Sequence, residues 1–178
     1  DSYNNLEKVF DVVYAKNGKS PVKLAGYHAL NSLRMEKGYL HWGHDIGVEE
    51  NPFEAGVGFC VNLNKKNPFL GQAALEEKKK SGLSKRKVNF ALSNNDLLIY
   101  HNEPIYFDGK IVGEISSGMY GFYLDKSLGM GYISNNDSYS VEEMMSHQKF
   151  EIEVAETKYS AEGSINCFYD PGREKILV

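Results

Sequence analysis

The chain has 178 residues, of which 42% are hydrophobic and 25% charged, and its net charge is −4. These values are typical of a folded domain and argue against disorder, and the acidic balance disfavours a nucleic-acid partner. No apolar run approaches the roughly 18 residues of a membrane helix, so we expect no membrane association. The sequence does not begin with Met, and we interpret it as a processed product or a piece of a longer protein.

The sequence of the first half of the chain predicts both helices and strands. Ser20 and Pro21 are typical of a helix start, because Ser caps the first turn and Pro suits the first helical position. Gly38 is typical of a helix end. The predicted elements are, in order, strand and loop over residues 1–19, a helix over 20–37, a strand over 58–63 and a helix over 71–81.

From residue 83 onward the pattern changes to short strands separated by turns. Asp108-Gly109 between two such runs is a strong hairpin signal. The spacing is typical of a small barrel or sandwich, so we divide the chain near Gly82 into residues 1–82 and residues 83–178. Strands are predicted over 85–93, 104–107, 110–116, 128–134, 149–155 and 164–169.

Several kinds of site are disfavoured. Neither a phosphate-binding loop nor a complete dinucleotide fingerprint is present. His41 and His44 have no obvious third ligand beside them, so we expect no metal site. Cys60 and Cys167 lie in apolar stretches, which predicts buried free thiols and a reducing compartment. That compartment is the cytoplasm, or the mitochondrial matrix in a eukaryote.

Glu36 is an unusual carboxylate, because it falls at the end of a predicted helix, where the helix dipole disfavours negative charge. A ligand that donates hydrogen bonds would make this position tolerable. The alternative, which the residues alone favour, is a surface charge paired with Arg34 or Lys37. Tyr39 and Trp42 are suited to wall a pocket for a flat ligand, although aromatic side chains at this density are more often core.

Short motifs spread over roughly residues 20–170 carry a resemblance. They are LRMEKGY from Leu33, WGHDI, NPFEAG, FLGQAAL, EPIY, GKIVG, SSG and GYI. In order and spacing they resemble the folate-binding aminomethyltransferase family. That family includes the glycine-cleavage T-protein and the C-terminal halves of sarcosine and dimethylglycine dehydrogenases. The motif EKGY resembles the dehydrogenase branch more than the T-protein branch.

The resemblance implies an α+β fold, with a partial folate-binding subdomain over residues 1–82 and a C-terminal antiparallel β-barrel over residues 83–178. It implies tetrahydrofolate as cofactor and Glu36 as the residue that holds the pterin, since a carboxylate accepts two parallel hydrogen bonds. A basic residue near Lys65 and Lys66 would contact the benzoyl-glutamate tail. The folate-binding candidates are Glu36, Arg34, Tyr39, Trp42, Lys65 and Lys66.

The departures from the family are also informative. The family's catalytic Asp lies in an N-terminal subdomain, and the FAD region of the dehydrogenases lies earlier still; this chain matches neither. We expect the C-terminal part of an enzyme that captures the carbon of an N-methyl amine, sarcosine or dimethylglycine, on tetrahydrofolate, with no catalytic residue of its own and no activity alone. Its partners would be folate, the amine and the missing folate and flavin regions or subunit. The alternatives are a glycine-cleavage-type aminomethyltransferase and a non-catalytic binding module that kept the fold.

Overall fold

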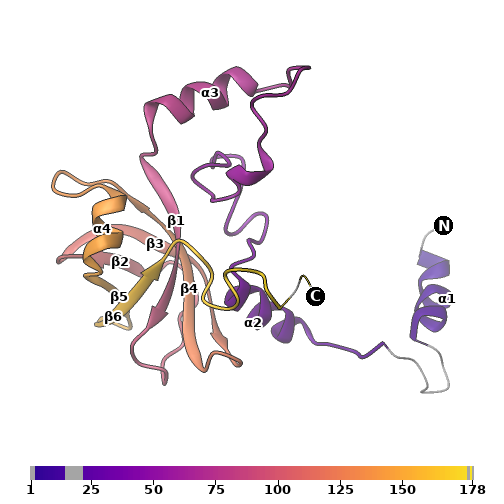
Figure 1. The fold of residues 1–178 in the computed structure, drawn as a ribbon. Helices are drawn as coiled ribbons and strands as arrows, with labels where there is room; N and C mark the ends of the chain where they lie inside the picture. The colour runs from indigo at the N-terminus through magenta and orange to yellow at the C-terminus, as the bar shows by residue number, and fades with distance from the viewer. Residues whose placement is uncertain (1–2, 15–21, 176, 178) are drawn as a thin grey trace. The chain divides into compact units, whose positions relative to one another are not determined.

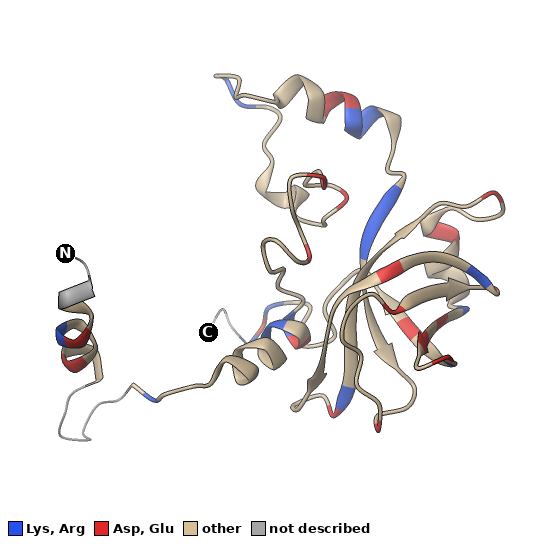
Figure 2. Ribbon diagram, turned by 180° about the vertical axis from the view of Figure 1, so that it is seen from behind, with Lys and Arg blue, Asp and Glu red and all other residues tan. Residues whose placement is uncertain are grey.

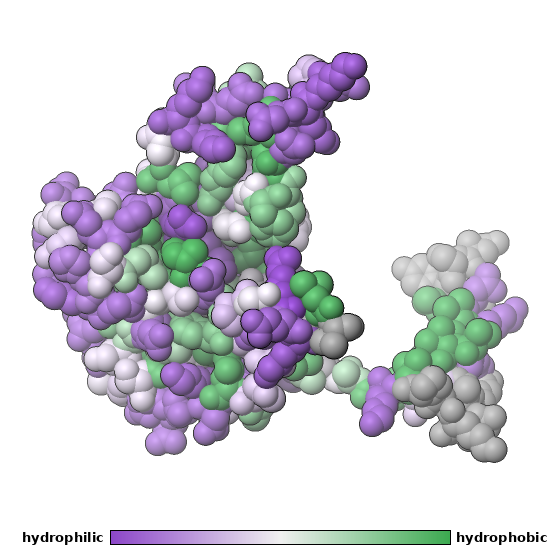
Figure 3. All heavy atoms as spheres, viewed as in Figure 1, coloured by the Kyte–Doolittle hydropathy of each residue, from purple (hydrophilic) through white to green (hydrophobic). Residues whose placement is uncertain are grey.

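The computed structural model describes residues 3–14, 22–175 and 177, and the chain divides into two compact units, Asp1–Leu30 and Asn31–Val178. Figure 1 shows the elements in chain order. In the first unit, α1 (Tyr3–Tyr14) is a helix, so the prediction of strand and loop is wrong for this segment. Its apolar residues recur at helical spacing, which is the signal that the sequence reading missed. Figure 3 shows them as a green surface, and they are Leu6, Val9, Phe10, Val12 and Val13.

The helix α2 (Tyr27–Lys37) is shorter than predicted. Residues 22–26 are not helical, and Ser20 and Pro21 lie outside the described residues. The first helical hydrogen bond runs from Leu30 N to Gly26 O at 3.2 Å. The predicted end is confirmed, because Gly38 has φ +69° and its N–H donates to Met35 O. A left-handed glycine of this kind is a common helix stop.

The segment between α2 and the barrel contains little regular structure. The strand predicted over residues 58–63 is wrong: η1 (Gly58–Cys60) is a single 3₁₀ turn. The N–H of Cys60 donates to Val57 O, and the N–H of Val61, just after the turn, donates to Gly58 O. The next predicted helix is confirmed as α3 (Gln72–Ser81). Its lysine run forms an exposed last turn, which Figure 2 shows in blue beside a red acidic stretch. None of the helices over residues 3–14 and 22–175 has the length and apolar character needed to cross a membrane.

The second half is a closed antiparallel barrel, as predicted. Its strands follow one another in the order β1-β4-β3-β2-β5-β6, and β6 pairs with β1 to close it. The Asp108-Gly109 hairpin between β2 and β3 is confirmed. The described strands are β1 (Lys85–Leu92), β2 (Pro104–Phe107), β3 (Lys110–Gly121), β4 (Lys126–Ser134), β5 (Phe150–Val154) and β6 (Thr157–Ser164).

Two features of the barrel differ from the prediction. The strand expected over residues 164–169 is wrong, because the ladder ends at Ser164. There Asn89 Nδ2 donates to the carbonyls of Ser164 (3.3 Å), Ile165 (3.4 Å) and Asn166 (2.9 Å) and turns the chain away from β1. A short helix, α4 (Val141–His147), was missed, although its capping box at Ser140 was readable from sequence.

The barrel core is built from aromatic and branched residues. Phe107 and Phe150 meet edge to face with ring centroids 5.0 Å apart, and Phe90 packs on Phe150 in the same way at 5.4 Å. Gly113 permits the close approach of β3 and β4, since a Cβ there would overlap the Tyr132 carbonyl. The fully buried large residues are Phe90, Phe107, Phe150, Leu92, Ile99, Ile105, Ile115, Leu128, Met130, Ile133, Met144 and Ile152.

The boundary near Gly82 stays a prediction, which limited proteolysis tests. A protease of broad specificity should cut between Lys78 and Lys87 before it cuts within residues 110–134. The reason is that the end of α3 is exposed, whereas residues 110–134 belong mostly to paired strands of the barrel. Mass spectrometry of the first fragments gives the positions. Early cleavage inside β3 or β4 would contradict the division.

Candidate functional site

Three charged side chains at the end of α2 leave the helix toward three different parts of the second unit. Arg34 reaches Asp45 and the strand β3. Glu36 reaches the turn between β3 and β4. Lys37 reaches the segment after β6, through Asp170. The Arg-x-Glu-Lys motif therefore docks this helix on the barrel.

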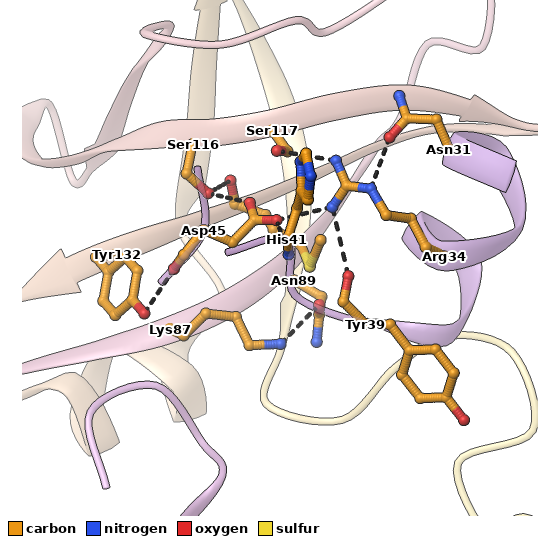
Figure 4. Close-up of polar contacts among 11 residues, drawn as sticks. Asn31, Arg34, Tyr39, His41, Asp45, Lys87, Asn89, Ser116, Ser117 and Tyr132 are labelled. Carbon is orange, nitrogen blue, oxygen red and sulfur yellow. Dashed lines mark hydrogen bonds and ion pairs between the residues drawn. The ribbon is translucent and has the colours of Figure 1, made fainter. Parts of the chain in front are cut away.

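The Arg34–Asp45 pair is the centre of a buried polar network (Figure 4). Arg34 Nη1 lies 2.7 Å from Asp45 Oδ2, and the backbone N–H of His41 donates to the same oxygen at 2.8 Å. Ser116 Oγ donates to Asp45 Oδ1 at 2.6 Å, and Arg34 Nη2 donates to Ser117 Oγ at 3.1 Å. Asp45 is 1% exposed. The network fixes the loop after α2 to β3, so we assign Arg34 a positioning role in this structure.

Glu36 is buried, with 2% of the residue exposed. Its Oε1 accepts hydrogen bonds from the backbone N–H groups of Tyr123 at 2.7 Å and Leu124 at 3.1 Å. The expected surface pair with Arg34 or Lys37 is therefore wrong, and the two N–H donors offset the unfavourable position at the helix end. Neither of these bonds uses Oε2.

Lys37 holds the segment that follows the barrel. Its Nζ donates to Asp170 O at 2.6 Å and lies 3.0 Å from Asp170 Oδ2. The backbone N–H of Tyr169 donates to Glu36 O at 3.1 Å. Because of these contacts, residues 165–173 lie against the end of α2 and close one side of a cavity.

This cavity has a volume of about 520 Å³, and Lys37 lines it whereas the buried Glu36 does not. Its charged side chains are Lys37, Lys87 and Arg173, and its described lining includes no carboxylate. Aromatic surface comes from Tyr39 and Phe59. The lining residues are Lys37, Gly38, Tyr39, Leu40, Ala55, Gly56, Val57, Phe59, Lys87, Ile165, Asn166, Cys167, Pro171 and Arg173. Such a lining suits a ligand with an aromatic part and negative charge.

Lys87 is the most buried cation of the cavity, at 7% exposure. Its Nζ donates to Asn89 Oδ1 at 3.0 Å. Burial lowers the pKa of this amine to about 8, and Arg86 acts in the same direction, while Asp45 and Cys167 oppose the shift. An ordinary Lys titrates near 10.4, so Lys87 is far easier to deprotonate.

The structure brings together only some of the candidates from the sequence. Tyr39 lines the cavity. Trp42 is 67% exposed and forms a backbone bridge with Ile46. Lys65 and Lys66 are exposed in the segment before α3, outside the cavity lining, with Lys65 Nζ 6.0 Å from the Phe69 ring.

Sequence reasoning missed three cavity residues, Phe59, Lys87 and Arg173. For Lys87 a signal was available, because it shares one face of β1 with the polar residue Asn89, inside a strand whose later residues are mostly apolar. Phe59 lies in the short turn η1 and Arg173 in the irregular segment after β6, and no sequence pattern indicated that either segment lies near α2.

The remaining expectations concern metals and thiols. His41 and His44 stack with ring centroids 5.5 Å apart, and among the described residues no group of three His, Cys, Asp or Glu is placed to hold a metal ion. Cys60 and Cys167 are free thiols, as expected. The expected burial is wrong for Cys60, which is exposed at the end of η1, and Cys167 is half-buried.

Comparisons with known proteins agree with this fold. The family described as the glycine cleavage T-protein C-terminal barrel domain matches residues 85–170, and the GCVT N-terminal domain family matches residues 2–65. The glycine cleavage system aminomethyltransferase T from Bartonella henselae has a TM-score of 0.72 at 21% identity, over 90% of this chain and 42% of that chain.

Two curated relatives that are named as enzymes are much longer than this chain. The 4-methylaminobutanoate oxidase (formaldehyde-forming) of Paenarthrobacter nicotinovorans is 36% identical over 94% of this chain and 20% of that protein. The mitochondrial sarcosine dehydrogenase of Homo sapiens is 31% identical over 94% of this chain and 18% of that protein. The chain thus spans about a fifth of the length of these relatives. With both family matches in order along it and the barrel at its end, the chain belongs to the glycine-cleavage T-protein family.

Proposed function

We propose that this chain is the C-terminal part of an enzyme that captures the carbon of an N-methyl amine, sarcosine or dimethylglycine, on tetrahydrofolate. The observation that carries the proposal is the basic and aromatic cavity at the end of α2, lined by Lys37 and Tyr39. Tetrahydrofolate has an aromatic benzoyl group and a tail that ends in carboxylates, which match this lining in kind. The compartment would be the cytoplasm, or the mitochondrial matrix, consistent with the name of the sarcosine dehydrogenase.

Each candidate residue has a proposed task. Glu36 would offer Oε2 to the pterin, while Oε1 stays on the turn after β3. Tyr39 would pack on the benzoyl group, and Arg173 would bind a tail carboxylate from its place 5.5 Å from the Phe59 ring. Arg34 would act indirectly, because its guanidinium is held by Asp45 and Ser117.

Other candidates lie outside the cavity. Lys65 and Lys66 would provide a second basic position for the tail, in the exposed segment before α3. Trp42 would contribute exposed aromatic surface beside the loop after α2. Tyr39 and Arg173, in contrast, line one cavity.

The chemical task of these residues is orientation. When bound, tetrahydrofolate supplies the nucleophilic nitrogen that takes up the one-carbon unit. Residues that hold it close to the amine-derived carbon raise the rate by proximity, and closure of the site by the preceding regions would keep water away. Without that capture, the carbon would be lost as formaldehyde, the product in the name of the P. nicotinovorans relative. FAD would belong to a preceding domain.

Calorimetric titration of the intact protein with 5-formyl-tetrahydrofolate tests the proposal. Arg173→Gln should weaken binding by about 10–100-fold, the equivalent of one lost charge-assisted hydrogen bond. Lys149→Gln is the control, because Lys149 pairs with Asp108 on the barrel, outside the cavity lining. A double substitution of Lys65 and Lys66 by Gln tests the second basic position. Absence of folate binding by the folded protein would reject the proposal in favour of a non-catalytic module.

A further inference from the structure

Lys87 differs from two comparable lysines in its partner. Lys37, in the same cavity, lies 3.0 Å from a carboxylate oxygen of Asp170. Lys85, two residues earlier on β1, lies 3.0 Å from Glu50. The Lys87 amine instead donates to the neutral amide oxygen of Asn89 at 3.0 Å. A neutral acceptor stabilises the ammonium form less than a carboxylate does.

The charged groups around Lys87 come from several elements. Asp45, buried in the loop after α2, and Cys167, after β6, favour the charged form, while Arg86 on β1 disfavours it. Arg173 lines the same cavity and adds positive charge, whereas the charge of Lys37 is balanced by Asp170. Burial is the largest influence and lowers the pKa of the amine to about 8. At pH 7.5 such an amine is roughly one quarter neutral, whereas an ordinary Lys is neutral in about one molecule per thousand.

We propose that Lys87 is a nucleophilic amine that adds reversibly to a small aldehyde, in particular a one-carbon aldehyde, within this cavity. A buried lysine with a neutral partner is the usual setting for carbonyl chemistry of this residue. The Nζ lone pair forms a bond to the carbonyl carbon, the C=O π bond opens, and one proton moves from nitrogen to oxygen. The product is a hydroxymethylamine, and no oxidant or reductant is consumed. Gly56 lines the same cavity beside Lys87, where a Cβ would lie 4.0 Å from Lys87 Cε, so a residue without a side chain leaves more room next to the amine.

The role of this adduct rests on the proposed function. An aldehyde that escapes capture by folate would be held on Lys87 instead of diffusing away, and the reversible bond would return it. The reactivity of the amine itself depends only on the cavity.

Reductive labelling measures that reactivity. The intact protein is treated at pH 7.5 with ¹³C-formaldehyde and cyanoborohydride, and the methylation rate of each lysine is followed by peptide mass spectrometry. Lys87 should be methylated at least about tenfold faster than Lys85 and Lys37, given its larger neutral fraction. At pH 10 the advantage should fall to about fourfold or less, because an ordinary lysine is then already about one quarter neutral. Methylation of Lys87 at the rate of Lys85 or slower at pH 7.5 would overturn the proposal.

Two further measurements make the result specific. Lys87→Met keeps the apolar stem, and it should remove the fast-labelled site while the rates at Lys37 and Lys85 stay unchanged. Folate titration of the unmodified protein separates this proposal from the proposed function. Selective labelling without folate binding supports the reactive amine and rejects the folate site. Folate binding without selective labelling supports the folate site and rejects the reactive amine.

Discussion

Asp45→Ala should lower the free energy of unfolding by about 3–5 kcal/mol, the usual cost of removing one partner from a buried ion pair. The substitution leaves the Arg34 guanidinium, 16% exposed in its side chain, without its carboxylate. It also removes the acceptor of the His41 N–H, and it leaves Ser116 Oγ with only its longer contact to Met130 O at 3.1 Å. Urea unfolding gives the value, with the fluorescence of Trp42, the single Trp, as one signal and circular dichroism as the other.

The matched control is an exposed ion pair. Lys149 lies 3.2 Å from Asp108, with side chains 52% and 46% exposed. Lys149→Ala should therefore cost no more than about 1 kcal/mol. Equal effects of the two substitutions would show that the Asp45 network does not hold the loop after α2 on the barrel.

Glu36→Gln should weaken folate binding by about 10–100-fold and leave the melting temperature nearly unchanged. The Gln carbonyl oxygen can replace Oε1 and keep the hydrogen bonds from Tyr123 and Leu124. The Gln amide group would replace Oε2 and present donors to the donors of the pterin. Folate affinity is measured by calorimetry on the intact protein and stability by a thermal melt of the same sample.

Glu36→Ala separates binding from folding. It leaves both backbone N–H groups without their acceptor, at a cost of about 1–3 kcal/mol for each buried group, so stability should fall together with affinity. If Glu36 has only a structural role, a different pattern is expected. Glu36→Gln then keeps full folate affinity, and only Glu36→Ala lowers the stability of the protein. That pattern would remove the pterin contact from the proposed function.

The parts of the fold that depend on local signals could be predicted from the sequence. Asp108-Gly109 is a turn that few other sequences specify as strongly, and the hairpin is present. Gly38 and Gly82 end helices because their positive φ suits the stop. The end of β6 could not be predicted in this way. It depends on the Asn89 side chain, which belongs to a strand some 75 residues earlier.

The candidate site was located in part. The sequence indicated that Glu36 is unusual, but its partners are backbone groups of a distant turn, and no sequence pattern identifies such groups. The cavity could not be predicted from the sequence for a related reason. Its lining residues Tyr39, Lys87 and Arg173 come from three segments that are far apart along the chain. The prediction for Lys65 and Lys66 rests on their distance along the chain from the NPFEAG motif, and that distance does not determine whether a loop lies against a cavity.

Closure of the barrel by β1 and β6 also has a consequence for synthesis on the ribosome. The partners of β1 are β4 and β6, so the strand emerges long before either neighbour exists. The contacts at the end of α2 can form only later still, because the partner of Lys37 is Asp170, near the end of the chain. Contacts between such distant residues make folding slow, and the exposed β1 edge is meanwhile open to wrong pairing. Nascent chains that stall before residue 164 should therefore depend on chaperones, and the site at the end of α2 forms last.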